Sequence, residues 1–297
     1  MLAEKYRLKS SARLVSVLNA DDTLFAKNWW IEPLAAAFRL TQIEFQDVVQ
    51  EETQWLTTHA IGVVPESAVA IKLAVERCMF EIPDHQLSQR YLWGIGEASS
   101  RRFFTGFPEI LVESSQYVER ASGGAVRFEA EIATCGLHAI VDGMTSAFRR
   151  KHPGLLRIPS GQQLEYDEID VPATGVVGAY CTADKALAIR YVHARGVPGE
   201  NIFFVGNGQA DIAGARQTKK LNGTIAHVYP IYPDPDSSEW SRLESERVFA
   251  QIRKFDPNCG FYVAQWRANS GNKNAGWALN EWLTHRLHTW HESTTHK

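Results

Sequence analysis

The chain has 297 residues, of which 44% are hydrophobic and 22% charged, and its formal net charge is -3. This composition is that of an ordinary globular protein, long enough for one large domain or for a core with an insert. The small net charge excludes a strong electrostatic field for nucleic acids or anionic membranes, so we expect neither as a partner.

No apolar run reaches the roughly 18 residues that a membrane span needs, and the apolar stretch near the N-terminus is too short for a signal sequence. We therefore expect a cytoplasmic protein. The four cysteines form no Cys-x-x-Cys pair, which argues against a zinc site or a disulfide framework; they are Cys78, Cys135, Cys181 and Cys259. The sequence does not predict the oligomeric state.

The first predicted element is a short buried strand, ARLVSVL, which ends at Leu18. From about Ala26 to Phe107, apolar residues recur at spacings of three and four, which predicts amphipathic helices. One of these helices, ESAVAIKLAVERCMF, is expected to begin near Ser67. The many aromatic residues of this stretch form a helical core or line a substrate site.

Strands and helices alternate in the second half of the chain. VRFEAEIATCG predicts a strand that breaks at Gly136 and leads into the helix LHAIVDGMTSAFRR, and LLRIPSGQQLEYDE predicts a hairpin with Gly161 in its turn. KALAIRYVHARG predicts a helix that ends at Gly196, followed by the strands NIFFV and GTIAHVYPIY. This alternation predicts an α/β fold with a doubly wound parallel sheet, and residues 239–297 are expected to be helical or partly loose.

Polar side chains follow several of these strands or begin the next helix. In doubly wound sheets ligands bind beyond the carboxyl ends of the strands, so we expect these side chains to converge. Together they offer a hydroxyl, an ammonium and carboxylates, which suit an anion with a divalent metal, and oxygen ligands favour Mg²⁺. The side chains are those of Asn19, Asp21, Thr23, Thr134, Lys185, Asn207 and Asp211, and Gly206 adds a backbone amide.

The order and spacing of these motifs resemble the haloacid dehalogenase (HAD) superfamily, whose members are mostly phosphatases. NADDT resembles the first motif, Asp-x-Asp-x-Thr, with Asn19 in place of the first aspartate. Thr134 in IATCG and Lys185 in TADKALAI match the second and third motifs. GNGQAD resembles the fourth motif, Gly-Asp-x-x-x-Asp, with Asn207 in place of an aspartate. The stretch from Val126 to Asp211 most resembles the phosphoserine-phosphatase-like branch.

The resemblance implies a domain organisation and an activity. It implies a Rossmann-like HAD core over residues 1–25 and 108–238 and an inserted α-helical cap over 26–107, and we expect residues 239–297 to form a C-terminal helical extension. It also implies Mg²⁺-dependent hydrolysis of a small phosphorylated metabolite through an aspartyl-phosphate.

The resemblance further implies a role for each matched residue. Position 19 would be the nucleophile, and Asp21 would protonate the leaving oxygen and then activate water. The phosphate would be bound by Thr23, Thr134, Gly136 and Lys185. The metal would be held by Asn19, Asp21, Asn207 and Asp211.

Two positions depart from the family pattern. Asn19 cannot form an acyl-phosphate, and Asn207 removes a carboxylate from the metal site, so the chain is expected to be almost inactive by the standard route. Three explanations stay open: an introduced Asp→Asn change, a naturally inactive relative that binds a phosphorylated ligand, and a wrong assignment of the motif. A haloacid dehalogenase proper would need no Mg²⁺, but Asp21 and Thr23 argue against it.

Simpler interpretations exist for some residues. The aspartates at the first motif, including Asp22, could cap a turn, and Thr182 competes for the role of the strand-end hydroxyl. GNGQAD could bind a dinucleotide, but it lacks the third glycine and comes late in the chain. The histidines near the C-terminus share a helix face and could bind a metal, although a polar surface is the simpler interpretation; they are His285, His288 and His291.

Overall fold

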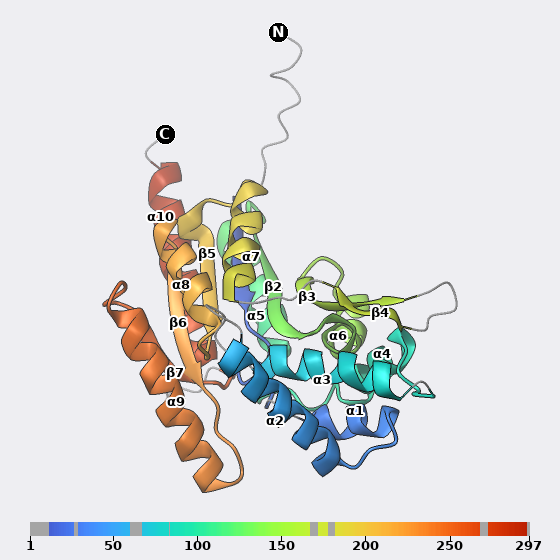
Figure 1. Ribbon diagram of the computed structural model, residues 1–297. Helices are drawn as coiled ribbons and strands as arrows, with labels where there is room; N and C mark the ends of the chain where they lie inside the picture. Colours follow the sequence, from blue (N-terminus) through green and yellow to red (C-terminus); the bar gives the residue numbers. More distant parts are fainter. Residues whose placement is uncertain are drawn as a thin grey trace.

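The structure is a computed structural model that describes residues 12–26, 29–59, 67–82, 84–166, 172–177, 182–267 and 273–295 (Figure 1). Its centre is a seven-stranded sheet with the order β4-β3-β2-β1-β5-β6-β7. Six strands are parallel, and β4 pairs antiparallel with β3. The predicted doubly wound α/β fold is thereby confirmed. The strands are β1 (Ala12–Leu18), β2 (Val126–Leu137), β3 (Leu156–Tyr166), β4 (Pro172–Val177), β5 (Ile202–Gly206), β6 (Thr224–Tyr229) and β7 (Gly260–Val263).

Strand β1 lies at the centre of the sheet and is covered on both faces. A strand in this position needs apolar residues on both sides of its backbone, which explains the continuous run that ends at Leu18. Leu18 is fully buried and pairs in register with Ile132 of β2 and Val205 of β5. The carboxyl end of β1 therefore lies between two other strands.

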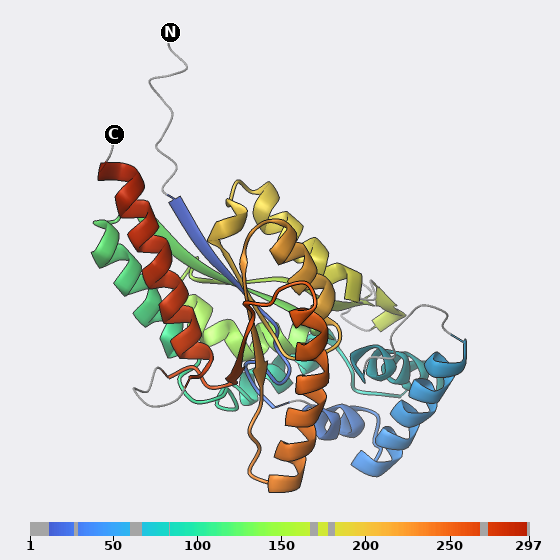
Figure 2. The same cartoon turned by 90° about the vertical axis from the view of Figure 1, so that its left-hand side faces the viewer.

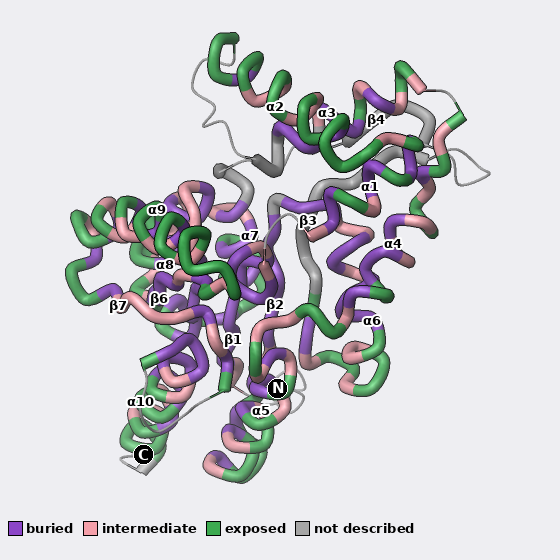
Figure 3. The backbone as a smooth tube through the Cα atoms, turned by 90° about the horizontal axis from the view of Figure 1, so that it is seen from below, coloured by how far each residue is buried: buried purple, intermediate pink, exposed green. Residues whose placement is uncertain are grey.

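Helices cover both faces of the sheet (Figure 2). On one face, α5 (Glu109–Ser122) and α10 (Ala275–Thr295) contribute Leu111 and Leu283 to the larger apolar cluster. On the other face lie α7 (Thr182–Ala194), α8 (Asp211–Lys220) and α9 (Pro235–Arg253), and a short 3-10 helix (Gly199–Asn201) precedes β5. Figure 3 shows the buried positions concentrated in the strands and the exposed ones on the outer sides of the helices.

The first four of the five described helices between β1 and β2 form an apolar cluster of their own. They are α1 (Ile31–Ala37), α2 (Gln42–His59), α3 (Ser67–Glu81) and α4 (Gln89–Ala98). Phe38 and Phe45 stack in this cluster, and Ile140 of α6 (His138–Lys151) joins it. The helices occupy the stretch expected to be helical, and the domain bounds at 26 and 107 stay a prediction.

Helices α4 and α6 are in close contact through one glycine on each. A methyl group at Gly96 would lie 2.0 Å from the backbone oxygen of Ile140, and one at Gly143 would lie 2.1 Å from that of Trp93. The indole nitrogen of Trp93 also donates a hydrogen bond of 3.1 Å to Asp142. Only glycine allows backbones to approach this closely, so the two positions fix how α4 sits on α6.

Two local predictions were wrong. Strand β3 continues through Gly161, and the reversal of the chain comes after Tyr166 instead. The segment expected to be helical or loose contains strand β7, which extends the parallel sheet beyond β6. Within the described ranges, the structure has no helix that is both long and apolar enough to cross a membrane.

Candidate functional site

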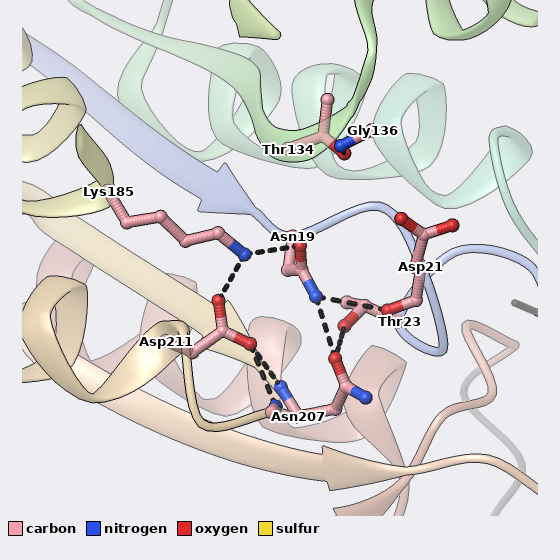
Figure 4. A network of polar contacts seen from close by, with 9 residues as sticks. Asn19, Asp21, Thr23, Thr134, Gly136, Lys185, Asn207 and Asp211 are labelled. Atoms are coloured by element: carbon pink, nitrogen blue, oxygen red, sulfur yellow. Dashed lines mark hydrogen bonds and ion pairs between the residues drawn. The ribbon is translucent and has the colours of Figure 1, made fainter. Parts of the chain in front are cut away.

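The site lies at the carboxyl edge of the sheet, where two loops leave neighbouring strands (Figure 4). Asn19 follows β1, and its backbone nitrogen donates a hydrogen bond of 2.8 Å to Val205 near the end of β5. Lys185 comes from the first turn of α7, and Asp211 is the first residue of α8. All three side chains are buried. They come from parts of the sequence that are far apart, and the fold brings them to the same edge of the sheet.

A buried ion pair joins the two helices at this edge. The ammonium of Lys185 lies 2.5 Å from Oδ1 of Asp211 and donates a hydrogen bond of 2.6 Å to Oδ1 of Asn19. The other oxygen of Asp211 accepts hydrogen bonds from the backbone nitrogens of Asn207, at 2.8 Å, and Gly208, at 2.9 Å. Buried charges need such partners because desolvation is otherwise costly. Asp211 thus fixes both the turn after β5 and the position of Lys185.

The side-chain amide of Asn19 connects this ion pair to the first loop. Its Nδ2 donates to the backbone oxygen of Asp21 at 3.0 Å and to Oδ1 of Asn207 at 2.7 Å. The hydroxyl of Thr23, expected to contact phosphate, donates to the same Oδ1 at 3.2 Å. Asn19 and Asn207, the two residues that differ from the family motifs, are therefore hydrogen-bonded to each other.

Asp21, Thr134 and Gly136 lie on the side of Asn19 that faces β2 (Figure 4). A methyl group at Gly136 would lie 3.4 Å from Oδ2 of Asp21 and 3.2 Å from Oγ1 of Thr134. The backbone nitrogen of Gly136 donates a hydrogen bond of 2.9 Å to that hydroxyl. The carboxylate of Asp21 points away from Asn207 in Figure 4.

Two aromatic residues that sequence reasoning missed hold the loop after β1. Trp266 is fully buried, and its Nε1 donates a hydrogen bond of 2.8 Å to the backbone oxygen of Thr23. The hydroxyl of Tyr232 donates to the carboxylate of Asp22, whose φ of 55° lies in the left-handed region. Aspartate adopts this conformation more readily than most residues. Neither aromatic residue lies near a motif in the sequence, so no local signal could have identified it.

His227 of β6 is a buried histidine close to the site. It pairs in register with Gly206, and its Nε2 lies 2.9 Å from the backbone oxygen of Ser245, to which it donates. Burial lowers the pKa of His227 to about 4, although the charge of Asp211 acts in the opposite direction. The imidazole is therefore neutral at physiological pH.

The predicted metal ligands are Asn19, Asp21, Asn207 and Asp211. In the described part of the chain, no group of three or more His, Cys, Asp or Glu side chains is arranged to hold a metal ion. The side-chain oxygens of Asn19 and Asp211 accept from the Lys185 ammonium, and that of Asn207 accepts from Nδ2 of Asn19 and the hydroxyl of Thr23. Mg²⁺ needs oxygen lone pairs directed at one point. In this arrangement the donor set does not fit a divalent cation.

The other candidate sites in the sequence gain no support. His288 lies 3.2 Å from Glu292, and His291 bonds to the backbone oxygen of Ala121, so these rings engage other groups. The side chain of Thr182 lies outside those that the structure describes. The turn in GNGQAD is occupied by the carboxylate of Asp211.

A cavity of about 230 Å³ lies at the opposite edge of the sheet. Its lining includes Ala12 and Val126, the first residues of β1 and β2, together with Glu200 and Arg286. Ligands of doubly wound sheets bind at the carboxyl ends of the strands. The cluster around Asn19 is therefore the better candidate for a functional site.

Comparison with known proteins identifies the fold. No model of a known protein family matches the chain, and no curated protein sequence matches it. Among solved structures, cytosolic 5'-nucleotidase IIIB bound to cytidine is similar, with 12% identity, coverage of 96% of this chain and 88% of that chain, and a TM-score of 0.51. A gene product of Archaeoglobus fulgidus has 14% identity, coverage of 80% and 85%, and a TM-score of 0.50.

A phosphoserine phosphatase in apo form has 14% identity, coverage of 73% of this chain and 86% of that chain, and a TM-score of 0.42. At such identities, structural likeness establishes the fold alone, since one fold supports many functions. The chain therefore shares the α/β fold of the nucleotidase and of the Archaeoglobus fulgidus protein.

Proposed function

We propose that the chain is a hydrolase of the haloacid dehalogenase type whose site takes a small phosphate monoester. We further propose that Asn19 keeps this site in a form that binds the ester without hydrolysing it. The expected ligand is a small phosphorylated metabolite, and the expected location is the cytoplasm.

The observation that carries the proposal is the position of Asn19. It follows the central strand, with Lys185 bound to its Oδ1 and Asp21 two residues further on. This is where the family resemblance places a nucleophilic aspartate, and the surrounding groups are those expected for such a site. An amide oxygen carries no full negative charge, so it is a far weaker nucleophile than a carboxylate.

With aspartate at position 19, each neighbouring group has a chemical task. The carboxylate would attack phosphorus, and Asp21 would give a proton to the leaving oxygen and then take one from water. Lys185 would offset negative charge close to the nucleophile. Phosphoryl transfer depends chiefly on positioning and charge stabilisation, so this small set of groups suffices.

Mg²⁺ dependence is proposed only for the form with aspartate at position 19. In the present chain, the amide nitrogen of Asn19 donates toward two of the oxygens expected to bind the metal. A carboxylate at this position would replace that nitrogen with a third oxygen, and such a set is suited to Mg²⁺.

The test compares phosphate release from a broad panel of phosphate esters, with Mg²⁺ present. Asn19→Asp is expected to hydrolyse some of them at least on the order of 10⁴-fold faster than the present chain, since a nucleophile is being restored. Asn222→Asp is the matched control, because it makes the same change at an exposed turn before β6. Asn19→Asp combined with Asp21→Asn should be inactive again.

Two outcomes separate the parts of this proposal. If Asn19→Asp stays inactive while a phosphorylated compound still raises the Tm of the present chain, the chain is a binding protein. If no ester is hydrolysed and none raises the Tm, the phosphate-ester proposal is wrong.

A haloacid dehalogenase is the second candidate, because such an enzyme needs no metal and the donor set here does not fit one. Halide release from 2-haloacids by Asn19→Asp, with no release of phosphate, would favour it. Thr23 and Asp21, which belong to the phosphatase form of the motif, make it the weaker candidate.

A further inference from the structure

We propose that this chain holds its site together without a divalent metal, because the side-chain amide of Asn19 takes the place of a metal ion between the loops after β1 and β5. The proposal concerns the same site as the proposed function and rests on it for the class of ligand. The binding of Mg²⁺ itself can be measured without any ligand.

The orientation of the Asn19 amide is fixed by its neighbours. The Lys185 ammonium has only donors, so the atom it contacts at 2.6 Å must be the amide oxygen. The amide nitrogen then faces the backbone oxygen of Asp21, which is an acceptor. A flipped amide would place hydrogens against the ammonium and an oxygen against a carbonyl, so it is excluded on chemical grounds.

The same logic extends to Asn207. Its contact with Nδ2 of Asn19, at 2.7 Å, must be made by an oxygen, and the hydroxyl of Thr23 donates to that oxygen as well. The two hydrogens of the Asn19 amide therefore serve one acceptor in each loop, Asp21 O and Asn207 Oδ1. This cross-link joins the two loops by hydrogen bonds, as a cation would join them by coordination.

The charges of the site agree with this role. With aspartates at positions 19 and 207, four carboxylates and the Lys185 ammonium would carry three net negative charges, and such a cluster would need a cation. The residues present are two carboxylates and one ammonium, which carry one net negative charge. The two amides together remove the charge that one Mg²⁺ would otherwise neutralise.

The two positions are not equivalent in this arrangement. In the Asn207 orientation seen here, aspartate at position 19 would turn a carboxylate oxygen toward Asp21 O and Asn207 Oδ1, so three oxygens would face one another without a hydrogen between them. Such a set either repels or binds a cation. Aspartate at position 207 would instead still accept from Asn19 Nδ2 and the Thr23 hydroxyl, so it requires no metal.

The experiment measures Tm in EDTA and in millimolar Mg²⁺, together with Mg²⁺ binding by titration calorimetry. The present chain and Asn207→Asp are expected to give the same Tm in both solutions and no saturable heat. Asn19→Asp is expected to have a lower Tm in EDTA, which Mg²⁺ raises in a saturable way. The double variant Asn19→Asp/Asn207→Asp should bind Mg²⁺ more tightly than Asn19→Asp does.

Gln209→Glu is the control for added charge, since it places a carboxylate two residues from Asn207 and outside the cross-link. It should not respond to Mg²⁺. Saturable Mg²⁺ binding by the present chain would overturn the proposal, and this measurement does not depend on whether any variant folds.

The binding of inorganic phosphate separates this proposal from the proposed function. Phosphate should bind the present chain equally well with EDTA and with Mg²⁺. If Mg²⁺ strengthens phosphate binding by the present chain, the metal-free site is wrong while the phosphate site stands. If the chain binds neither phosphate nor any ester, yet the variants respond to Mg²⁺ as expected, the proposed function fails and the cross-link stands.

Discussion

The indole nitrogen of Trp266 donates a hydrogen bond of 2.8 Å to the backbone oxygen of Thr23, although 243 positions separate the two residues. Trp266 belongs to the segment that the sequence indicated as a C-terminal extension. In this segment, Trp266, Leu279 and Leu283 are buried in the same apolar cluster as β1. The C-terminal region thus helps to position the loop that carries Asn19.

Trp266→Phe should destabilise the protein more than its lost volume implies. The substitution keeps an aromatic ring but leaves the oxygen of Thr23 without its donor, at a cost of about 1–3 kcal/mol in the free energy of unfolding. Urea denaturation measures this value. Trp282→Phe is the matched control, because among the described residues the buried indole nitrogen of Trp282 has no hydrogen-bond partner. Equal losses in the two variants would show that the hydrogen bond contributes nothing.

Lys185→Met should be strongly destabilising. It removes the ammonium from a site in which Asp211 is almost completely buried, and a buried carboxylate that loses its partner costs about 3–5 kcal/mol. Denaturation in urea at neutral pH gives the change. Adding Asp211→Asn should recover part of the loss, since no uncompensated charge then remains in the pair. A single variant as stable as the parent would mean that water reaches this carboxylate.

Gly96→Ala should lower stability, whereas Gly94→Ala on the same helix should not. A methyl group at Gly96 would meet the Ile140 oxygen at 2.0 Å, whereas one at Gly94 would have no atom within 4 Å. We expect a loss of about 1–3 kcal/mol for Gly96→Ala. Gly94→Ala should gain about 0.5–1 kcal/mol, because alanine is the better helix former. Thermal unfolding of the two variants side by side measures the difference, and the same sign for both would contradict the close contact of α4 and α6.

His227 should make the protein less stable as the pH falls below neutrality. Its pKa is about 4 in the folded state, against an ordinary value of 6.5, because burial disfavours the charged imidazole. Between these two values the unfolded chain binds a proton that the folded chain does not. Stability is therefore lost as the pH falls from 6.5 to 4, by an amount on the order of 3 kcal/mol.

His227→Phe is the variant that isolates this effect. It preserves an aromatic ring against Phe249 and Phe261 and removes the titrating group. The unfolding free energy of the parent minus that of the variant should decrease as the pH falls from 6.5 to 4. Two parallel stability curves between pH 6.5 and 4 would rule out His227 as the source.

The sequence allowed the prediction that Asn19, Asn207 and Asp211 lie close together, because strand ends are recognisable from local pattern. The apolar run before Asn19 and the run before Asn207 each end in polar residues, and parallel strands bring such ends to one edge. Strand β7 could not be recognised, since four residues are too few to show alternation. The roles of Trp266 and Tyr232 depend on contacts across the whole chain, which no local pattern contains.

The contact of α4 with α6 also bears on whether the four inserted helices are an independent unit. An insert with a surface of its own could be cut out and folded alone, or exchanged with another protein. Here Ile140 of α6 lies within the apolar cluster of the insert. Gly96 of α4 and Gly143 of α6 allow the backbones of these two helices to approach each other closely. A peptide of residues 26–107 would thus lack part of its own core. We expect it to remain unfolded in isolation, as measured by circular dichroism.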